Sequence, residues 1–210
     1  YETLLRGLQV SKRSLEQVLR QSGNRFILEY KRASPSEGTI NSTLTVDDVC
    51  EAYQGFADAV SVLTDQTFFD GSFEHLRQLK NKMDVPVLCK DFILEPYQVI
   101  EARYYGADAI LLMLSILDDQ QYQTLAALAD DFSLDVLTEV HTEAELQRAV
   151  QLGARIIGIN NRNMNTLQTD IAVTEKLASK VPADRLVISE SGISSRKDIL
   201  RLTSKVDGFL

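Results

Sequence analysis

Short apolar runs that end in polar residues alternate with helix-like segments along the chain, and this pattern predicts a (β/α)₈ TIM barrel in the α/β class. The clearest run is 85–90, which has Pro86 near its start and ends at Lys90. Successive runs are about 21–33 residues apart, as in repeated strand–helix units. Parallel neighbouring strands bring their carboxyl ends together, so one polar pocket is expected there. Similar runs end at Lys31, Glu139, Asn160 and Glu190.

An open, doubly wound sheet is the alternative architecture. It is less favoured because the polar strand ends recur around the whole set instead of gathering at one switch point. No linker or change of composition interrupts the chain, so residues 1–210 are expected to form a single domain. Within it, 1–24 are expected to be a short N-terminal helical extension. The barrel is expected to be truncated after its eighth strand, with the final loop and helix 8 absent.

The first elements follow from periodicity and turn chemistry. Residues 1–22 are polar with leucine and valine at helical spacing, which predicts one or two amphipathic helices. The first strand is expected over 25–31, followed by a loop of turn formers. Thr45 is a good N-cap, and Asp48 stands at the capping-box position, so a helix is expected over 45–56.

The later elements follow from the same signals. Ser72 is the expected N-cap of its helix, Pro96 stands near a first helical turn, and Gly106 and Gly153 suit helix C-termini. Further strands are expected at 59–64, 85–90, 107–113, 134–139, 155–160, 185–190 and 206–210. Further helices are expected at 72–82, from 95 or 96 to 105, at 118–132, 142–152 and 170–180, and from 194 or 195 to about 202.

Composition narrows the class of partner. The formal net charge is -8, which argues against nucleic acid or an anionic membrane as the main partner, so a phosphate site must be local. We see no apolar run long enough for a membrane span and no signal-peptide pattern. Cys50 and Cys89 are the only cysteines, and Cys89 falls in a predicted buried strand. A reducing cytoplasm without a disulfide framework is therefore expected.

Charged residues at the strand ends are candidates for acid–base chemistry. Glu29 and Lys31 alternate along the first strand, so their side chains point to the same side, into the barrel. Lys90, Glu139 and Glu190 end three other strands. Close charges can push neighbouring pKa values apart, which suits general acid–base catalysis. The structural alternative is that Glu29 and Lys31 form a buried ion pair that only fills the barrel.

Polar and aromatic residues beyond the strands are candidates for binding. The set Asn160, Asn161 and Arg162 can hydrogen-bond a polar substrate, with a hydrogen-bonded turn as the alternative. The small residues of 189–192 leave backbone N–H groups accessible to an anion, and Ser34 can assist. Further candidates are aromatic residues for a pocket wall, or for simple packing (Phe68, Phe69 and Phe92), and two isolated histidines interpreted as surface or rim residues (His75 and His141). We see no metal constellation.

The motifs of the chain resemble those of the indole-3-glycerol phosphate synthase family and occur in the same order. As a set, these motifs are highly specific for that family. The sequences of these motifs are most similar to the bacterial domain of this family that is sometimes fused to phosphoribosylanthranilate isomerase. The matching segments are Phe-Ile-Leu-Glu-Tyr-Lys-Arg-Ala-Ser-Pro-Ser (26–36), Ser-Val-Leu-Thr-Asp (61–65), Phe-Phe-Asp-Gly-Ser (68–72), Leu-Cys-Lys-Asp-Phe (88–92), Leu-Thr-Glu-Val (137–140), Gly-Ile-Asn-Asn-Arg (158–162) and Ile-Ser-Glu-Ser-Gly-Ile (188–193).

The resemblance implies an activity without metal or organic cofactor. The substrate would be 1-(2-carboxyphenylamino)-1-deoxyribulose 5-phosphate, which is cyclised, decarboxylated and dehydrated to indole-3-glycerol phosphate. The resemblance makes Lys90 the general acid for ring closure and Glu139 an acid or base for dehydration. It makes Glu29 and Lys31 the second catalytic pair, without dividing the proton steps among the four. Asn160, Arg162 and Glu190 match polar active-site positions, and Ser34, Ser191 and Gly192 match substrate or phosphate contacts.

The chain departs from the family pattern at both ends. The family continues past Gly-Phe-Leu into an Ile-Gly-Ser segment that cradles the phosphate, and its N-terminal extension is longer. We therefore expect the chain as given to turn over poorly, which a comparison with a version extended through the last helix tests. Two other functions stay open: a Schiff-base aldolase barrel using Lys90 or Lys31, and a barrel that binds a phosphate ester without turnover.

Overall fold

The computed structural model describes residues 8–210, and its strands form a closed barrel. All eight barrel strands are parallel, in the order β1-β10-β9-β8-β7-β6-β5-β4, with β1 paired to both β10 and β4. The predicted barrel class is therefore confirmed, and the open sheet is excluded. The strands are β1 (Arg25–Tyr30), β4 (Ala59–Leu63), β5 (Val87–Lys90), β6 (Ala109–Met113), β7 (Asp135–Val140), β8 (Ile156–Asn160), β9 (Leu186–Glu190) and β10 (Gly208–Phe209).

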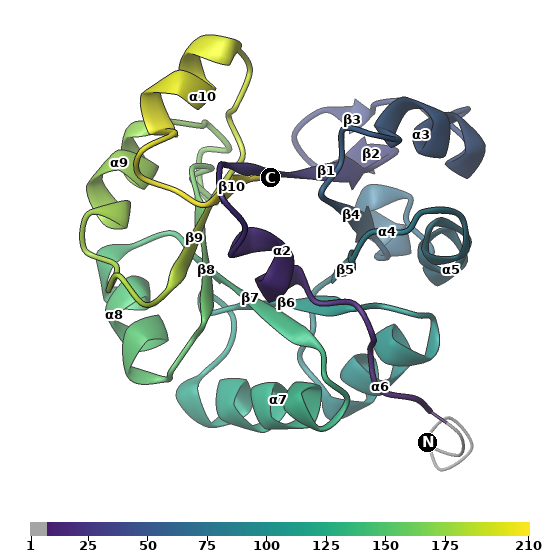
Figure 1. Ribbon diagram of the computed structural model, residues 1–210, viewed down its shortest axis with the longest axis horizontal. Coiled ribbons are helices and arrows are strands. Elements are labelled where there is room, and N and C mark those ends of the chain that lie inside the picture. The colour runs from purple at the N-terminus through teal and green to yellow at the C-terminus, as the bar shows by residue number, and fades with distance from the viewer. Residues whose placement is uncertain (1–7) are drawn as a thin grey trace.

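Helices surround this ring of strands, as Figure 1 shows. Their first turns carry the capping residues that the sequence predicts. Thr45 and Asp48 form a reciprocal capping box, and Ser72 accepts a hydrogen bond from the backbone N–H of Glu74. The outer helices are α3 (Val46–Tyr53), α4 (Gln66–Phe69), α5 (Phe73–Lys82), α6 (Pro96–Tyr104), α7 (Asp119–Asp131), α8 (Glu143–Gln151), α9 (Ala172–Ala178) and α10 (Arg196–Leu202).

Two short features follow strand ends and were not predicted from the sequence. β2 (Ala33–Ser34) and β3 (Gly38–Thr39) form an antiparallel hairpin where a loop was expected. The four-residue helix α4 follows β4, and Gly71 comes soon after it. A Cβ at Gly71 would lie 2.4 Å from the carbonyl oxygen of Leu63, so only glycine fits that turn.

The hydrophobic core has an inner part and an outer part because strand side chains alternate between two directions. The outer part lies between strands and helices and includes Val60, Val62 and Leu79. The inner part lies inside the ring and includes Ile27 and Leu137. Every helix in the described part of the chain is too short or too polar to cross a bilayer.

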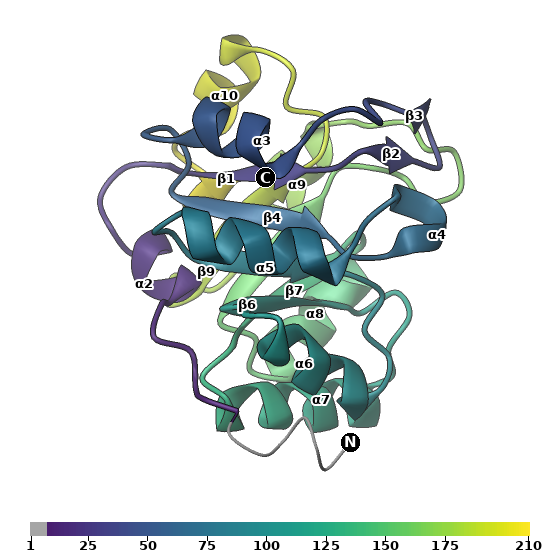
Figure 2. The same ribbon diagram turned by 90° about the vertical axis from the view of Figure 1, so that its right-hand side faces the viewer.

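The helix α2 (Leu15–Leu19) lies across the N-terminal end of the ring. Leu15 and Leu19 are buried in the inner core, where each contributes about 2 kcal/mol. Figure 2 shows α2 and the β2–β3 hairpin at opposite ends of the barrel. The predicted extension is thus confirmed as helical over 15–19, while the part predicted for residues 1–7 lies outside the described residues. With one end covered, the carboxyl end is where a cavity can open.

Candidate active site

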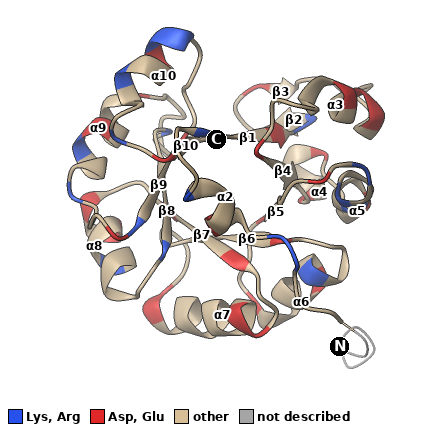
Figure 3. Ribbon diagram, in the orientation of Figure 1, with Lys and Arg blue, Asp and Glu red and all other residues tan. Residues whose placement is uncertain are grey.

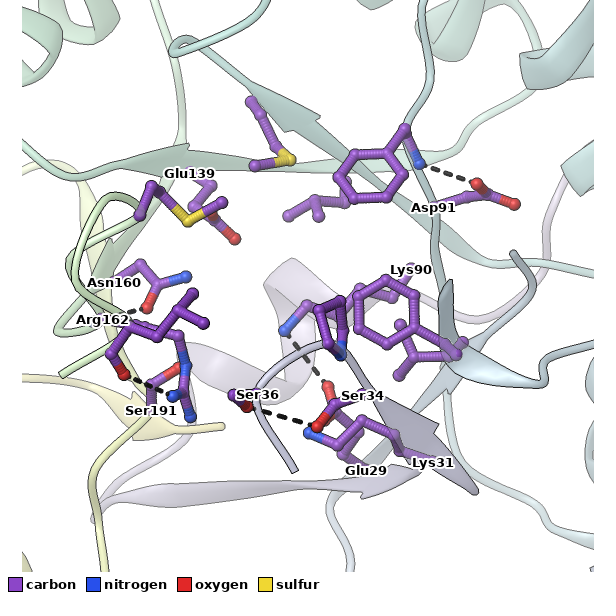
Figure 4. Close-up of a pocket in the computed structure, with 18 residues that line it drawn as sticks. Glu29, Lys31, Ser34, Ser36, Lys90, Asp91, Glu139, Asn160, Arg162 and Ser191 are labelled. Carbon is purple, nitrogen blue, oxygen red and sulfur yellow. Dashed lines mark hydrogen bonds and ion pairs between the residues drawn. The ribbon is translucent and has the colours of Figure 1, made fainter. Parts of the chain in front are cut away.

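A cavity of about 230 Å³ opens at the carboxyl ends of the strands. Its lining comes from β1, β4, β5, β6, β7 and β8 and from segments that follow these strands or β9 (Figure 4). The strands therefore bring residues that are far apart in sequence to one place. Nine of the predicted site residues line it: Glu29, Lys31, Ser34, Lys90, Phe92, Glu139, Asn160, Arg162 and Ser191.

A network of ion pairs joins β1 to β5 on the cavity floor. The Lys31 Nζ lies 2.6 Å from Glu29 Oε1, and the Lys90 Nζ lies 3.1 Å from Glu29 Oε2. Burial opposes the charge on Glu29, but the two lysines lower its pKa to about 2. Burial likewise opposes the charge on Lys90, yet the surrounding carboxylates hold its pKa well above the ordinary value. Lys90 is therefore an ammonium group that faces the cavity.

Glu190 lies beneath this floor and is fully buried. Its Oε2 accepts a hydrogen bond of 3.3 Å from Lys90, while its Oε1 has no hydrogen-bond partner among residues 8–210. Burial is the main reason that its pKa rises to about 8, with Glu139 adding to the rise and Lys90 opposing it. Gly158 makes room for it, because a Cβ there would lie 1.9 Å from Glu190 Oε1.

Glu139 faces the cavity from β7 and is also almost completely buried. Its Oε1 lies 3.2 Å from the Nε2 of His141, and the His141 Nδ1 lies 3.5 Å from Glu145 Oε2. Burial opposes ionisation of Glu139, but His141 and Lys90 hold its pKa below the ordinary value. The site thus contains a buried carboxylate, Glu139, across the cavity from the ammonium of Lys90 (Figure 4).

The proposed phosphate contacts lie at the rim. Ser34 comes from the β2–β3 hairpin and Ser191 from the turn after β9, and both line the cavity. The Arg162 backbone N–H donates to Asn160 Oδ1, and the Arg162 side chain donates from Nη1 to the Leu167 carbonyl. These hydrogen bonds hold the loop after β8 in place. Gly192 follows Ser191 with a φ of +76° but does not itself line the cavity.

Asn161, for which substrate binding and a hydrogen-bonded turn were both open, is held by hydrogen bonds within the protein. Its side chain is buried and donates to the Ser189 hydroxyl and the Ser191 carbonyl. Its Oδ1 accepts from both the backbone and the hydroxyl of Thr174. For Asn161 the structure therefore favours the second of the two alternatives, a hydrogen-bonded turn, because its hydrogen-bonding groups join β9 to α9.

An apolar wall faces these charged groups. The Phe92 ring lies 6.1 Å from the Phe69 ring, and both line the cavity together with Leu111 and Met113. Phe68 packs on Phe92 from outside and is exposed. One side of the cavity therefore suits an aromatic group, while the other suits anions.

The charges outside the cavity do not single out another site. Acidic and basic residues of both signs are distributed over the helices around the ring (Figure 3). Over residues 8–210, no group of three or more His, Cys, Asp or Glu is arranged to hold a metal ion.

Comparison with known families assigns the chain. The model of the family described as indole-3-glycerol phosphate synthase matches residues 2–210. The chain belongs to this family. It is 50% identical over 200 residues to a "Tryptophan biosynthesis protein TrpCF" of Vibrio cholerae, a match that covers 95% of this chain and 43% of that protein. Proteins of the same name are 46% identical in Yersinia pestis and 45% identical in Salmonella typhi, over 95% and 97% of this chain.

The synthase family assignment agrees with the barrel and with the residues in it. The chain spans less than half the length of the curated relatives named above. More distant structures share only the fold. A thiamine phosphate pyrophosphorylase of Pyrococcus furiosus has a TM-score of 0.63 at 20% identity, over 93% of this chain and 86% of that one. A glycerol uptake operon antiterminator-related protein of Thermotoga maritima has a TM-score of 0.60 at 14% identity, over 89% of this chain and 94% of that one.

Two residues of this synthase-family site were missed by sequence reasoning. His141 was interpreted as a surface or rim residue, but only 11% of its side chain is exposed and it contacts Glu139. Glu145 was counted only as part of a helix. The pattern Glu139–x–His141, with Glu145 four residues later, is the signal that was available. It is weak because a histidine after a strand end is usually a loop residue.

Proposed function

We propose that the chain converts 1-(2-carboxyphenylamino)-1-deoxyribulose 5-phosphate to indole-3-glycerol phosphate, a step of tryptophan biosynthesis in the cytoplasm. The observation that carries this proposal is the convergence of Lys31, Lys90 and Glu139 on one cavity in a chain of the synthase family. The names of the relatives, which refer to tryptophan biosynthesis, support it. Substrate carboxylate leaves as carbon dioxide and the ketone oxygen as water, so each turnover takes up one proton.

Lys90 is the proposed general acid for ring closure. The aromatic carbon that bears the carboxylate attacks the ketone carbon, a carbon–carbon bond forms, and the ketone oxygen gains a proton from the ammonium of Lys90. The carboxylate then leaves as carbon dioxide, and its bonding electrons restore aromaticity. The protein mainly positions the substrate for this step, with Phe92 against the aromatic ring.

Dehydration then completes the indole ring. The hydroxyl group leaves with a proton, and the neighbouring C–H loses one to a base, so that a double bond forms. Glu139 is the proposed acid or base of this step, with Asn160 beside it and the Lys31–Glu29 pair on the opposite wall. Ser34, Ser191, Gly192 and Arg162 are proposed to bind the phosphate and its polar neighbours, and Glu190 is proposed to hold Lys90 from below.

The longer relatives support one further part of the proposal. Each of the relatives named above is more than twice as long as the segment it shares with this chain. We propose that the full gene product carries a fused phosphoribosylanthranilate isomerase domain, which would supply a pathway intermediate to this one. Expression of the complete gene and assay of both reactions tests this.

Formation of indole-3-glycerol phosphate from the synthetic substrate tests the main proposal. Release of one carbon dioxide per indole-3-glycerol phosphate formed is the expected result. Binding of the substrate without product would favour the alternative of a barrel that binds a phosphate ester without turnover. The aldolase alternative requires an unprotonated lysine, whereas the neighbouring carboxylates favour the protonated form of Lys90. Borohydride with a ketose phosphate should therefore leave no covalent adduct on Lys90 or Lys31, and an adduct would support the aldolase.

A further inference from the structure

Three side chains form a line that leads away from the cavity behind Glu139. His141 follows β7 directly, and Glu145 lies in the first turn of α8. The His141 Nε2 lies 3.2 Å from Glu139 Oε1, and its Nδ1 lies 3.5 Å from Glu145 Oε2. The imidazole therefore stands between two carboxylates that come from different elements. The mechanism above uses only the first of them.

The local backbone holds the outer carboxylate in place. The His141 backbone N–H donates to Glu145 Oε2 at 2.6 Å, and the Thr142 hydroxyl accepts from the Glu145 backbone N–H. Both ring nitrogens of His141 are shielded from solvent. Attraction between these charges is therefore weakly screened, and although burial opposes a charged imidazole, the two carboxylates raise the pKa of His141 to about 10.

The other cations of the site have other close partners. Lys31 pairs with Glu29, and Lys90 lies between Glu29 and Glu190. The groups that face Glu139 are Lys90 from β5, Glu190 from β9, Asn160 from β8 and His141. The groups that face His141 are Glu139 and Glu145. Arg162 lines the same second cavity as His141. His141 is thus the cation in salt-bridge contact with Glu139 in the described part of the chain.

We propose that His141, held by Glu145, is a positioning residue that fixes the orientation and the charge of Glu139 during dehydration. The inference rests on the proposed function, because it assigns a task to the neighbours of the proposed acid or base. Without His141, a buried Glu139 would have only the shared Lys90 to balance its charge, and its carboxylate would be free to rotate.

The position of His141 makes this role separable from substrate binding. His141 and Glu145 line a second, polar cavity of about 490 Å³, and neither is among the residues that line the first. A substitution at His141 therefore leaves the substrate-facing surface intact. An effect on kcat with little effect on KM is the result expected of a positioning residue.

The kinetic test compares His141→Gln, Glu145→Gln and the control Glu143→Gln. Glu143 lies in the same first turn of α8 but pairs with Lys180 at the surface. His141→Gln should lower kcat about ten-fold, since part of the acid–base contribution is lost, and KM should stay within about two-fold. Loss of the cation raises the pKa of Glu139, so the limb of the pH profile that reports Glu139 should move upward by about one unit. Glu145→Gln should do the same to a smaller extent.

An activity-independent measurement separates this inference from the proposed function. The chain has only two histidines, so ring resonances of His141 and His75 can be followed by NMR as pH changes. Burial and Arg32 lower the pKa of His75, which makes it an internal reference. We expect His141 to titrate far above His75, and its midpoint to fall in the Glu139→Gln variant.

Each result decides one of the two claims. Failure of both the chain as given and a version extended through the last helix to form product would overturn the proposed function, while the NMR titration would still report on the three side chains. An ordinary midpoint for His141, or an active His141→Gln enzyme with an unmoved pH profile, would overturn the positioning role. A shift in the Glu143→Gln control as large as that in Glu145→Gln would also overturn it, because any acidic residue of the helix would then suffice.

Discussion

The two ends of the barrel both bury carboxylates, but they treat them differently. At the N-terminal end Asp108 is fully buried, and both of its oxygens have partners: Ser11 and Lys80 on Oδ1, and Lys80 with the Val87 backbone N–H on Oδ2. At the carboxyl end, Glu139 and Glu190 are equally buried, yet Glu190 Oε1 has no hydrogen-bond partner among residues 8–210, and Glu139 Oε1 has only the ion-pair contact with His141.

This difference separates residues that hold the fold from residues that act. Asp135 at the N-terminal end accepts hydrogen bonds from the Ser14 hydroxyl and the Glu16 backbone N–H, and so anchors α2 across the ring. A buried polar group without a partner costs about 1–3 kcal/mol, and natural proteins retain such groups mainly where function requires them. The incomplete hydrogen bonding of Glu190 and Glu139 therefore supports placing the proposed active site at the carboxyl end.

The strongest way to test the contrast is Lys90→Met at the carboxyl end. Removing the proposed general acid should lower kcat about 10²- to 10⁴-fold, because proton donation to the ketone oxygen is lost. Steady-state kinetics and Tm measured on the same preparation check it. Near wild-type turnover in a folded Lys90→Met variant would contradict the assignment of Lys90 as the acid.

The matched change at the other end is Lys80→Met. The Lys80 Nζ lies 2.6 Å from Asp108, and loss of a partner leaves a buried charge less well compensated. We expect the free energy of unfolding to fall by about 3 kcal/mol, with kcat nearly unchanged. Urea unfolding together with kinetics at a temperature below the transition measures both. A variant that keeps its stability and loses turnover would reverse the contrast between the two ends.

Gly158→Ala refines the comparison with a change of one methyl group. The new Cβ would displace Glu190, whose Oε2 contacts Lys90, and would also approach Leu137 at 3.1 Å. We expect kcat to fall about ten-fold through misplacement of Lys90, with about 1–2 kcal/mol of destabilisation from overpacking. Gly153→Ala is a control, because its Cβ meets nothing within 4 Å, although its φ of +80° also costs stability. Equal losses of turnover in both variants would show that general destabilisation, and not the displacement of Glu190, is responsible.

Features of the fold that depend on local sequence signals could be predicted, whereas those that depend on contacts between distant residues could not. The strands were predicted to within two residues at each end, and Thr45, Ser72 and Ser195 were found at helix starts, because those signals are local. Strand periodicity also predicted the inward direction of Glu29 and Lys31. α4 and the β2–β3 hairpin were missed because elements of two to four residues depend on tertiary contacts, such as the Arg32–Asp70 ion pair between them.

The limits at the site have the same cause. The arrangement of the strands in the barrel places Gly158 next to Glu190, and the path of the chain after β7 turns His141 back toward Glu139. Neither follows from residue type. The role of Asn161 stayed open because a polar residue after a strand looks alike in sequence whether it faces the cavity or a neighbouring helix. The hydrogen bonds of the Asn161 amide, which only coordinates reveal, distinguished the two cases.

The smallest expected effect is the contribution of Glu190 to the free energy of unfolding. Its ionised carboxylate is expected to destabilise the fold, whereas the fully paired carboxylate of Asp108 stabilises it. The folded pKa of Glu190 is raised, so folding favours its protonated form, and its ionisation destabilises the fold as pH rises from its unfolded value near 4.5 toward about 8. Glu190→Gln stays neutral at every pH. We therefore expect the variant to gain about 1 kcal/mol relative to wild type above pH 8, and less near pH 5, while it loses turnover. Urea unfolding at both pH values measures the difference.

Asp108→Asn is the opposing control, because that carboxylate has all its partners. It should lose stability at both pH values and keep its turnover. If Glu190→Gln instead loses stability at high pH, then Lys90 stabilises the Glu190 carboxylate more than burial destabilises it. In that case Glu190 resembles Asp108, and Glu139 alone carries the contrast between the two ends, since its Oε1 has only the ion-pair contact with His141 in the described part of the chain.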